Sequence, residues 1–121
     1  MKVELTRTFE FNAAHSLPHV NDGHKCRHVH GHNFTLEVSV RGVVDPERGW
    51  LMDYGDIRAV VAPLVKELDH SMLNEVTELA NPTSENIARW FWNRLEGLLP
   101  GLHRITIYET PGSRCTYWGE A

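Results

Sequence analysis

The 121-residue chain has the composition of a soluble globular protein, with 41% hydrophobic and 23% charged residues, and a formal net charge of −4. This length suits one compact domain, which we expect to span residues 1–121, and the acidic balance disfavours sequence-independent binding of nucleic acid. No apolar segment resembles a signal peptide or a membrane span, so we expect a cytoplasmic protein that does not act at a membrane.

Alternating apolar and polar residues predict two long strands in the first part of the chain. Odd-numbered apolar residues indicate a strand over residues 2–13, with His15 following at its end. Turn-forming residues then dominate 18–25, which is expected to be a loop. The clearest alternation in the sequence follows this loop and predicts a strand over residues 30–44.

Apolar residues at steps of three and four predict two helices in the second half. Asp53 is placed to cap the first helix. Its apolar positions are Ile57, Val60, Val61, Leu64, Val65 and Leu68. Pro63 lies within this pattern and is expected to bend or interrupt the helix. Residues 81–85 supply caps for the second helix. Its buried stripe is expected to contain Ile87, Trp90, Phe91, Leu95 and Leu98.

Two short strands are expected to close the chain, over residues 103–109 and 114–118, with a Pro111–Gly112 turn between them. The element order is then ββααββ. This order predicts an α+β fold in which a four-stranded antiparallel sheet carries both helices on one face. The edges of such a sheet are unpaired, and unpaired edges favour association between copies, so we expect an oligomer.

Eight histidines in so short a chain are its main compositional anomaly, and three of them form a candidate metal site. His30 and His32 stand two residues apart at the start of a predicted strand, so both side chains leave the same face. His15 ends the neighbouring strand. Three neutral imidazoles with an open fourth position are typical of catalytic zinc. The alternative is that these are only polar residues at strand ends, and His28 is a further histidine that could compete for the metal.

Cys26 lies in a polar loop just upstream of the histidine pair. A thiol beside a dication ionises more readily, and the thiolate can act as base or nucleophile. The alternative is that Cys26 is a small buried hydrophobe, which is the commonest fate of a free cysteine. Cys115 has no comparable neighbours in sequence and is assigned to packing. In a reducing compartment both thiols are expected to be free.

Three more polar residues are ambiguous from the residues alone. Asp69 and His70 end the first predicted helix and could transfer protons if both faced one cleft. Surface Asp-His pairs are nevertheless common, and a histidine at a helix end also interacts favourably with the helix dipole. Glu109 ends a predicted strand, where most glutamates are solvated. In a pocket, however, its carboxylate could accept two parallel N–H bonds from a planar ligand.

Together these positions form an ordered set of motifs: Phe11-x-Ala13-Ala14-His15, Cys26-x-x-x-His30-Gly31-His32-Asn33, Asp53-Tyr54, Leu68-Asp69-His70, Pro82-Thr83-Ser84-Glu85-Asn86 and Glu109-Thr110. Over nearly its whole length the chain resembles the 6-pyruvoyltetrahydropterin synthase family, and most of all the short bacterial branch that serves queuosine biosynthesis. The resemblance implies the tunnelling fold, in which a trimer closes a barrel and two trimers stack as a homohexamer. Barrel closure would remove the unpaired edges.

The resemblance also implies a role for each motif. The Zn²⁺ ligands would be His15, His30 and His32. Cys26 would be the catalytic base, Asp69 and His70 would complete the proton relay, and Glu109 would anchor the pterin ring. The pterin pocket would be shaped by the segment that contains Thr83 and Ser84. Charge alone suggests contacts to the triphosphate from Lys25, Arg27 and His24.

The implied substrate is 7,8-dihydroneopterin triphosphate. Zinc would acidify its side-chain hydroxyls while Cys26 and His70 move protons, so that triphosphate is eliminated and acetaldehyde is lost. The product would be 6-carboxy-5,6,7,8-tetrahydropterin. Three alternatives stay open. The enzyme could stop at 6-pyruvoyltetrahydropterin, the chain could be a non-catalytic zinc-binding module, or it could be a zinc hydrolase, which would need a carboxylate base near the metal.

Overall fold

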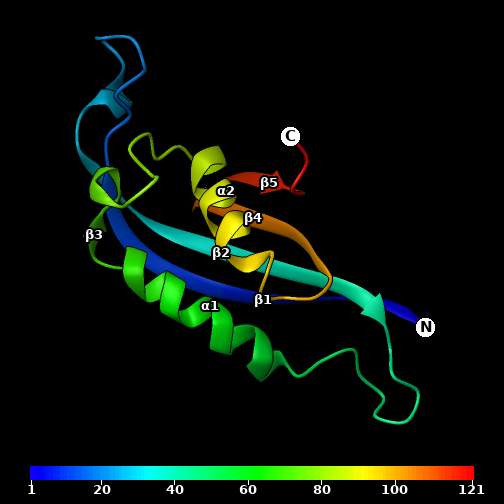
Figure 1. Cartoon of the computed structure of the whole chain (residues 1–121). Helices are drawn as coiled ribbons and strands as arrows, with labels where there is room; N and C mark the ends of the chain where they lie inside the picture. The colour runs from blue at the N-terminus through cyan, green and yellow to red at the C-terminus, as the bar shows by residue number, and fades with distance from the viewer.

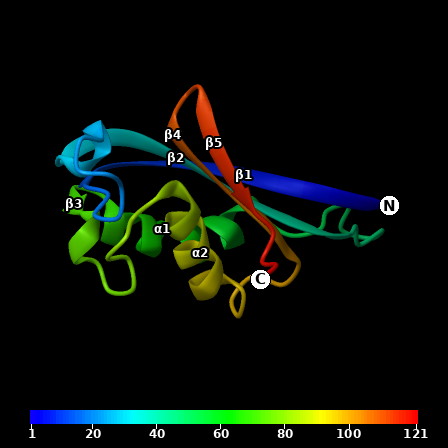
Figure 2. The ribbon, with the colours of Figure 1, turned by 90° about the horizontal axis from the view of Figure 1, so that it is seen from above.

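A five-stranded sheet with two helices on one face forms the framework of the protein, in a computed structural model that describes residues 1–121 (Figure 1). The elements are, in chain order, β1 (Lys2–His15), η1 (Lys25–Arg27), β2 (His30–Val43), α1 (Tyr54–Leu68), β3 (Ser71–Met72), η2 (Leu73–Glu75), α2 (Ser84–Leu95), β4 (Leu102–Thr110) and β5 (Ser113–Tyr117). The strand order in the sheet is β3-β1-β2-β4-β5. Figure 2 shows both helices on the same side of the sheet.

The predicted α+β fold is confirmed, with one additional strand. The four expected strands all form and pair antiparallel, β1 with β2, β2 with β4, and β4 with β5. The unexpected strand is β3, which pairs parallel with β1 at the edge of the sheet. A strand of two residues is too short to show an alternating pattern, so the sequence carried no signal for it.

The hydrophobic core lies between the sheet and the helices. Phe11 on β1, Phe34 on β2 and Phe91 on α2 are each at most 1% exposed. The rings of Phe11 and Phe34 stack with their centroids 5.0 Å apart, and the ring of Phe91 lies 6.1 Å from that of Phe11. This aromatic cluster fixes β1 and β2 against α2 just before the strand ends that carry the histidines.

Both predicted helix caps are confirmed. The Asp53 carboxylate accepts a hydrogen bond from the Gly55 N–H at 2.8 Å, and the Thr83 hydroxyl accepts one from the Asn86 N–H at 3.1 Å. Each cap satisfies a backbone donor that has no partner within the first turn of its helix. The cap at Thr83 matters for the site, because it fixes the start of α2 beside the histidines.

Two details of the helix predictions were wrong. The break considered at Pro63 does not occur, because α1 continues through this exposed residue and its ring removes only one backbone donor on the solvent side, and a bend at Pro63 stays a prediction. Leu98 was expected on the buried stripe of α2. The helix ends at Leu95, so Leu98 lies in the following turn and is 57% exposed.

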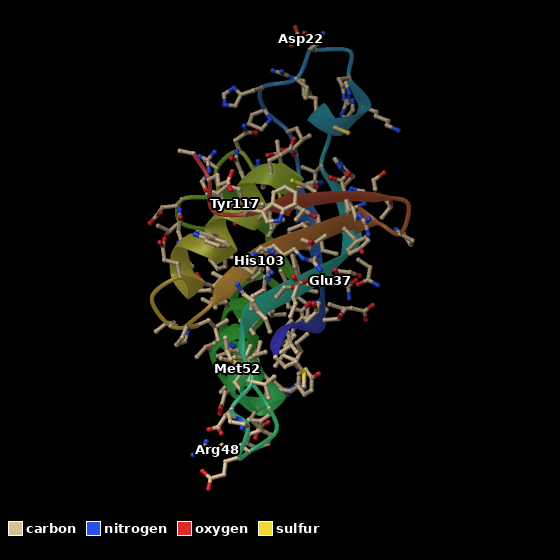
Figure 3. The ribbon with its side chains drawn as sticks, turned by 90° about the vertical axis from the view of Figure 1, so that its right-hand side faces the viewer. Asp22, Glu37, Arg48, Met52, His103 and Tyr117 are labelled. Carbon is tan, nitrogen blue, oxygen red and sulfur yellow. The ribbon has the colours of Figure 1, made fainter.

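The sheet face away from the helices is open and polar. The hydroxyls of Thr6 and Ser39 lie 2.7 Å apart across β1 and β2. The Arg104 guanidinium on β4 donates to the Glu4 carboxylate on β1 at 2.7 Å. Two long loops leave opposite ends of the molecule, one carrying Asp22 and the other Arg48 (Figure 3). None of the helices combines the length and the apolar character needed to cross a bilayer.

Candidate metal centre and thiol cavity

Three of the predicted metal ligands converge at one end of the sheet. In the β1–β2 register His15 lies directly opposite His30, and Ala13 lies opposite His32, so all three imidazoles project to the helix-facing side. One ligand nitrogen from each ring lies within 4.8 Å of those of the other two. The ring centroids are 4.5 to 5.2 Å apart. This arrangement could hold a single metal ion.

Backbone carbonyls orient two of these rings. Nδ1 of His15 donates to the Pro82 carbonyl at 2.8 Å, and Nδ1 of His30 donates to the His28 carbonyl at 2.7 Å. With the proton on Nδ1, Nε2 of each neutral ring keeps a free lone pair. The Nε2 atoms of His15 and His32 are buried and have no hydrogen-bond partner. Buried polar atoms are rarely left unpaired, so these atoms fit a site that binds a metal ion.

Electrostatics favours the neutral form of His15 and His32. Burial lowers the pKa of His15, and the nearby imidazoles of His30 and His32 lower it further. Burial also lowers the pKa of His32, against the opposing effect of the Glu109 carboxylate. Because only a neutral imidazole can donate its lone pair to a metal, both shifts favour metal binding at neutral pH.

These shifts predict that the metal-free protein loses stability below about pH 6.5, the usual histidine pKa. His15 and His32 bind protons less readily in the folded chain than in the unfolded chain, so acidification shifts the equilibrium toward unfolding. The effect is at most about 1.4 kcal/mol per pH unit for each histidine. Urea unfolding with a chelator present should therefore show a shallower acid dependence in His15→Gln than in the unsubstituted protein. Equal slopes would contradict this prediction.

Glu109, near the end of β4, lies between the histidines and α2. Its Oε1 atom is 3.3 Å from Nε2 of His32, but the pair does not have hydrogen-bond geometry. Its Oε2 atom accepts a hydrogen bond from the Ser84 hydroxyl at 3.3 Å. Ser84 is the first residue of α2, and the amino end of a helix favours a negative charge. Helix and serine therefore hold this carboxylate beside the metal ligands.

A cavity of about 470 Å³ opens beside the histidines. Its lining residues are Lys25, Cys26, His30, His32, Glu109, Thr110 and Ser113. The half-buried thiol of Cys26 is free. Of the predicted site, the fold thus places the thiol, the carboxylate and two metal ligands around one space. Thr110, which the Glu109-Thr110 motif contains but to which no role was assigned, and Ser113, which was not predicted, join them.

Cys115 is a different kind of thiol. It lies beside Glu85 and Ser84 on the wall of an adjoining cavity of about 220 Å³. Burial raises the pKa of the Cys115 thiol, and the negative charge of Glu85 raises it further. A thiol in these surroundings stays protonated at neutral pH, which agrees with its assignment to packing.

Asp69 and His70 lie together but away from the thiol. Oδ1 of Asp69 accepts a hydrogen bond from the Asn12 N–H at 2.9 Å, and Oδ2 lies 3.5 Å from Nε2 of His70. The His70 ring lines a second cavity, of about 570 Å³, together with Asn12 and Asn33. By strand alternation these two asparagines face the open side of the sheet, opposite the metal ligands. Within one chain His70 and Cys26 therefore line different cavities, although His32 borders both.

The remaining predicted residues also fall into two groups, those that line the thiol cavity and those whose polar atoms are bonded elsewhere. Lys25 lines the thiol cavity. His24 contacts the turn instead, because its Nδ1 atom accepts the Cys26 N–H at 3.0 Å. The hydroxyl of Thr83 is occupied as the cap of α2. The side chain of His28 is not in the metal-binding group, and only its carbonyl takes part. The two orienting carbonyls could not be predicted, because a backbone acceptor has no residue signature.

Fold and site together define an α+β protein with a three-histidine group that could hold a metal ion, beside a cavity that combines imidazoles with a free thiol and a carboxylate. Residues 4–120 match the family described as 6-pyruvoyl tetrahydropterin synthase, and the chain belongs to this family. The resemblance expected from the motifs is therefore confirmed.

Three relatives illustrate the breadth of the family. The chain is 42% identical over 120 residues to the 6-carboxy-5,6,7,8-tetrahydropterin synthase of Synechocystis, covering 94% of this chain and 92% of that protein. It is 38% identical over 112 residues to the dihydroneopterin monophosphate aldolase of Pyrococcus furiosus, covering 90% and 91%. The structure of Caenorhabditis elegans 6-pyruvoyl tetrahydropterin synthase matches with a TM-score of 0.89 at 30% identity, covering 99% of this chain and 97% of that chain.

Proposed function

We propose that this protein is a zinc-dependent 6-carboxy-5,6,7,8-tetrahydropterin synthase of queuosine biosynthesis. It converts 7,8-dihydroneopterin triphosphate and one water molecule to 6-carboxytetrahydropterin, acetaldehyde and triphosphate. The observation that carries the proposal is the cavity in which Cys26 and Glu109 flank His30 and His32. The 42% identity to the Synechocystis synthase supports this choice of reaction.

Zinc fits the proposed ligands because three neutral imidazoles leave a coordination position open for substrate. When bound, the metal supplies a Lewis acid that makes the substrate side-chain hydroxyls easier to deprotonate. The chain supplies the rest. The carbonyls of Pro82 and His28 hold two rings with Nε2 directed to the site, and the Cys26 thiolate takes a proton from the adjoining carbon.

Glu109 anchors the pterin ring in this proposal. The 2-amino group and N3–H of a pterin are two parallel donors, which match the two oxygens of a carboxylate. We expect Glu109→Gln to weaken pterin binding about 10- to 150-fold, which corresponds to the loss of a charge-assisted contact of about 1.5–3 kcal/mol. Neopterin binding followed by fluorescence would measure this change. Zinc content should stay the same in the variant, and unchanged neopterin affinity would count against the role of Glu109.

The proton relay requires a second copy of the chain. Asp69 and His70 are on the open side of the sheet, whereas Cys26 is at the helix-covered side, so we propose that the relay of one copy serves the thiol of its neighbour. Copies joined through the edge of β5 and through the part of β1 that the short strand β3 leaves unpaired would close a barrel whose inner wall is the polar sheet face. We propose a homohexamer, formed from two such trimers.

Product analysis tests the proposed reaction. The zinc-loaded protein is incubated with 7,8-dihydroneopterin triphosphate, and acetaldehyde and inorganic triphosphate are both measured. We expect them in equal amounts. Triphosphate without acetaldehyde would instead identify a 6-pyruvoyltetrahydropterin synthase, and neither product would favour a non-catalytic zinc-binding module. The identity to the Pyrococcus furiosus aldolase justifies dihydroneopterin monophosphate as a second substrate, which we expect to react poorly.

A further inference from the structure

Arg27 makes its contacts within the loop that carries the reactive thiol. Its Nη1 atom donates to the Val20 carbonyl at 3.0 Å and to the Pro18 carbonyl at 3.3 Å. It also lies 3.4 Å from the carboxylate of Asp22, which is 97% exposed. All three contacts are solvent-exposed, and only the two carbonyl contacts have hydrogen-bond geometry, so they are the defined interactions of this side chain.

The geometry of η1 explains why Arg27 points away from the cavity. A 3₁₀ turn has three residues per turn, so consecutive side chains point about 120° apart. Lys25 and Cys26 line the cavity, while Arg27 reaches back across the loop to residues 18–20. The charge of Arg27 suggested a contact to the substrate phosphates, but in this structure its guanidinium is directed to backbone carbonyls instead.

Polar contacts hold the turn in place, because η1 contains no buried residue. The Cys26 carbonyl accepts the Leu17 N–H at 2.8 Å, and the Cys26 N–H donates to the His24 ring at 3.0 Å. The two hydrogen bonds from Arg27 are the only side-chain hydrogen bonds that join η1 to residues 18–20. A segment with few apolar contacts opens easily when such hydrogen bonds are lost.

We infer that Arg27 is a positioning residue that holds the Cys26 turn against residues 18–20, and that Lys25, not Arg27, meets the phosphates of the substrate. The consequence for catalysis rests on the proposed function. The consequence for the accessibility of the Cys26 thiol does not rest on the proposed function, because it depends only on how firmly the turn is held.

The test uses zinc-loaded protein in a Cys115→Ser background, so that Cys26 is the only thiol. We expect Arg27→Ala to raise the rate of Cys26 alkylation by iodoacetamide at least about threefold, because a looser turn exposes the half-buried sulfur. We expect kcat to fall about 10- to 100-fold through misplacement of the thiol, with KM nearly unchanged. Arg27→Lys, which keeps a long donor, should restore most of both values.

Binding of inorganic triphosphate, measured by calorimetry, separates the two cations. Lys25→Ala should weaken it, whereas Arg27→Ala and the neutral Arg27→Gln should leave it nearly unchanged. The inference is overturned if alkylation is unaltered in Arg27→Ala, or if both Arg27 variants weaken triphosphate binding as much as Lys25→Ala does. Zinc content and Tm show that each variant is folded. A chain without pterin turnover would refute the proposed function, yet alkylation would still decide the role of Arg27.

Discussion

Replacing the thiol of Cys26 should abolish most of the turnover while leaving the metal in place. We expect Cys26→Ala to lower kcat about 10²- to 10⁴-fold, the usual contribution of a positioned acid-base group. The cavity places this sulfur beside the metal ligands, but the metal-binding group itself consists of three imidazoles. Zinc per chain should therefore remain at the unsubstituted value, as measured by elemental analysis.

Cys115→Ala is the matched control for this prediction. Its thiol is also half-buried and free, but burial raises its pKa and it does not line the thiol cavity. We expect turnover within about threefold of the unsubstituted enzyme, as for a substitution outside the reaction. Equal losses in the two variants would contradict a specific role for Cys26, as would loss of zinc in Cys26→Ala.

Removing the buried ligand His15 should have the second large effect. Loss of a group that only orients a ligand lowers metal affinity roughly 10- to 100-fold. We expect His15→Ala, which removes a ligand itself, to lower zinc affinity by more than this factor. His15 is fully buried and donates to the Pro82 carbonyl, so His15→Ala also leaves that carbonyl unpaired. We expect the free energy of unfolding of the metal-free protein to fall by about 1–3 kcal/mol.

Competition for zinc with a chelating dye measures the affinity, and His103→Ala provides the control. His103 is on β4, where its ring lies 3.6 Å from the Glu4 carboxylate, and it is not part of the metal-binding group. Its replacement should leave zinc affinity unchanged. If zinc affinity stays the same in His15→Ala, or falls equally in both variants, His15 is not a ligand.

Much of the site could be predicted because strand alternation places side chains in space. The two-residue spacing of His30 and His32, with only Gly31 between them, puts both imidazoles on one face of a strand whatever the tertiary structure. Placing His15 required that β1 and β2 be adjacent and antiparallel, and the register that puts it opposite His30 is one that keeps the apolar residues of both strands on the helix-facing side. The fold class followed from the same patterns, since all four predicted strands and both helices form.

Other features could not be read from the sequence, because they depend on backbone groups or on more than one chain. The Pro82 carbonyl that orients His15 is 67 residues away from it and has no side-chain signature. The charge of Arg27 suggested a phosphate contact, but the local turn directs it to backbone carbonyls. Asp69 and His70 lie together, but their place beside Asn12 follows from the pairing of the two-residue strand β3 with β1, for which the sequence has no signal.

The proposed reaction depends most on three imidazoles sharing one metal ion with a free coordination position. X-ray absorption spectroscopy of the zinc-loaded protein tests this most directly. We predict a first shell of three nitrogens and one oxygen at about 2.0–2.1 Å, with no sulfur near 2.3 Å. The three nitrogens should show imidazole scattering. A zinc–sulfur distance would mean that Cys26 closes the site and cannot serve as the base, and a shell without three imidazoles would contradict the metal centre itself.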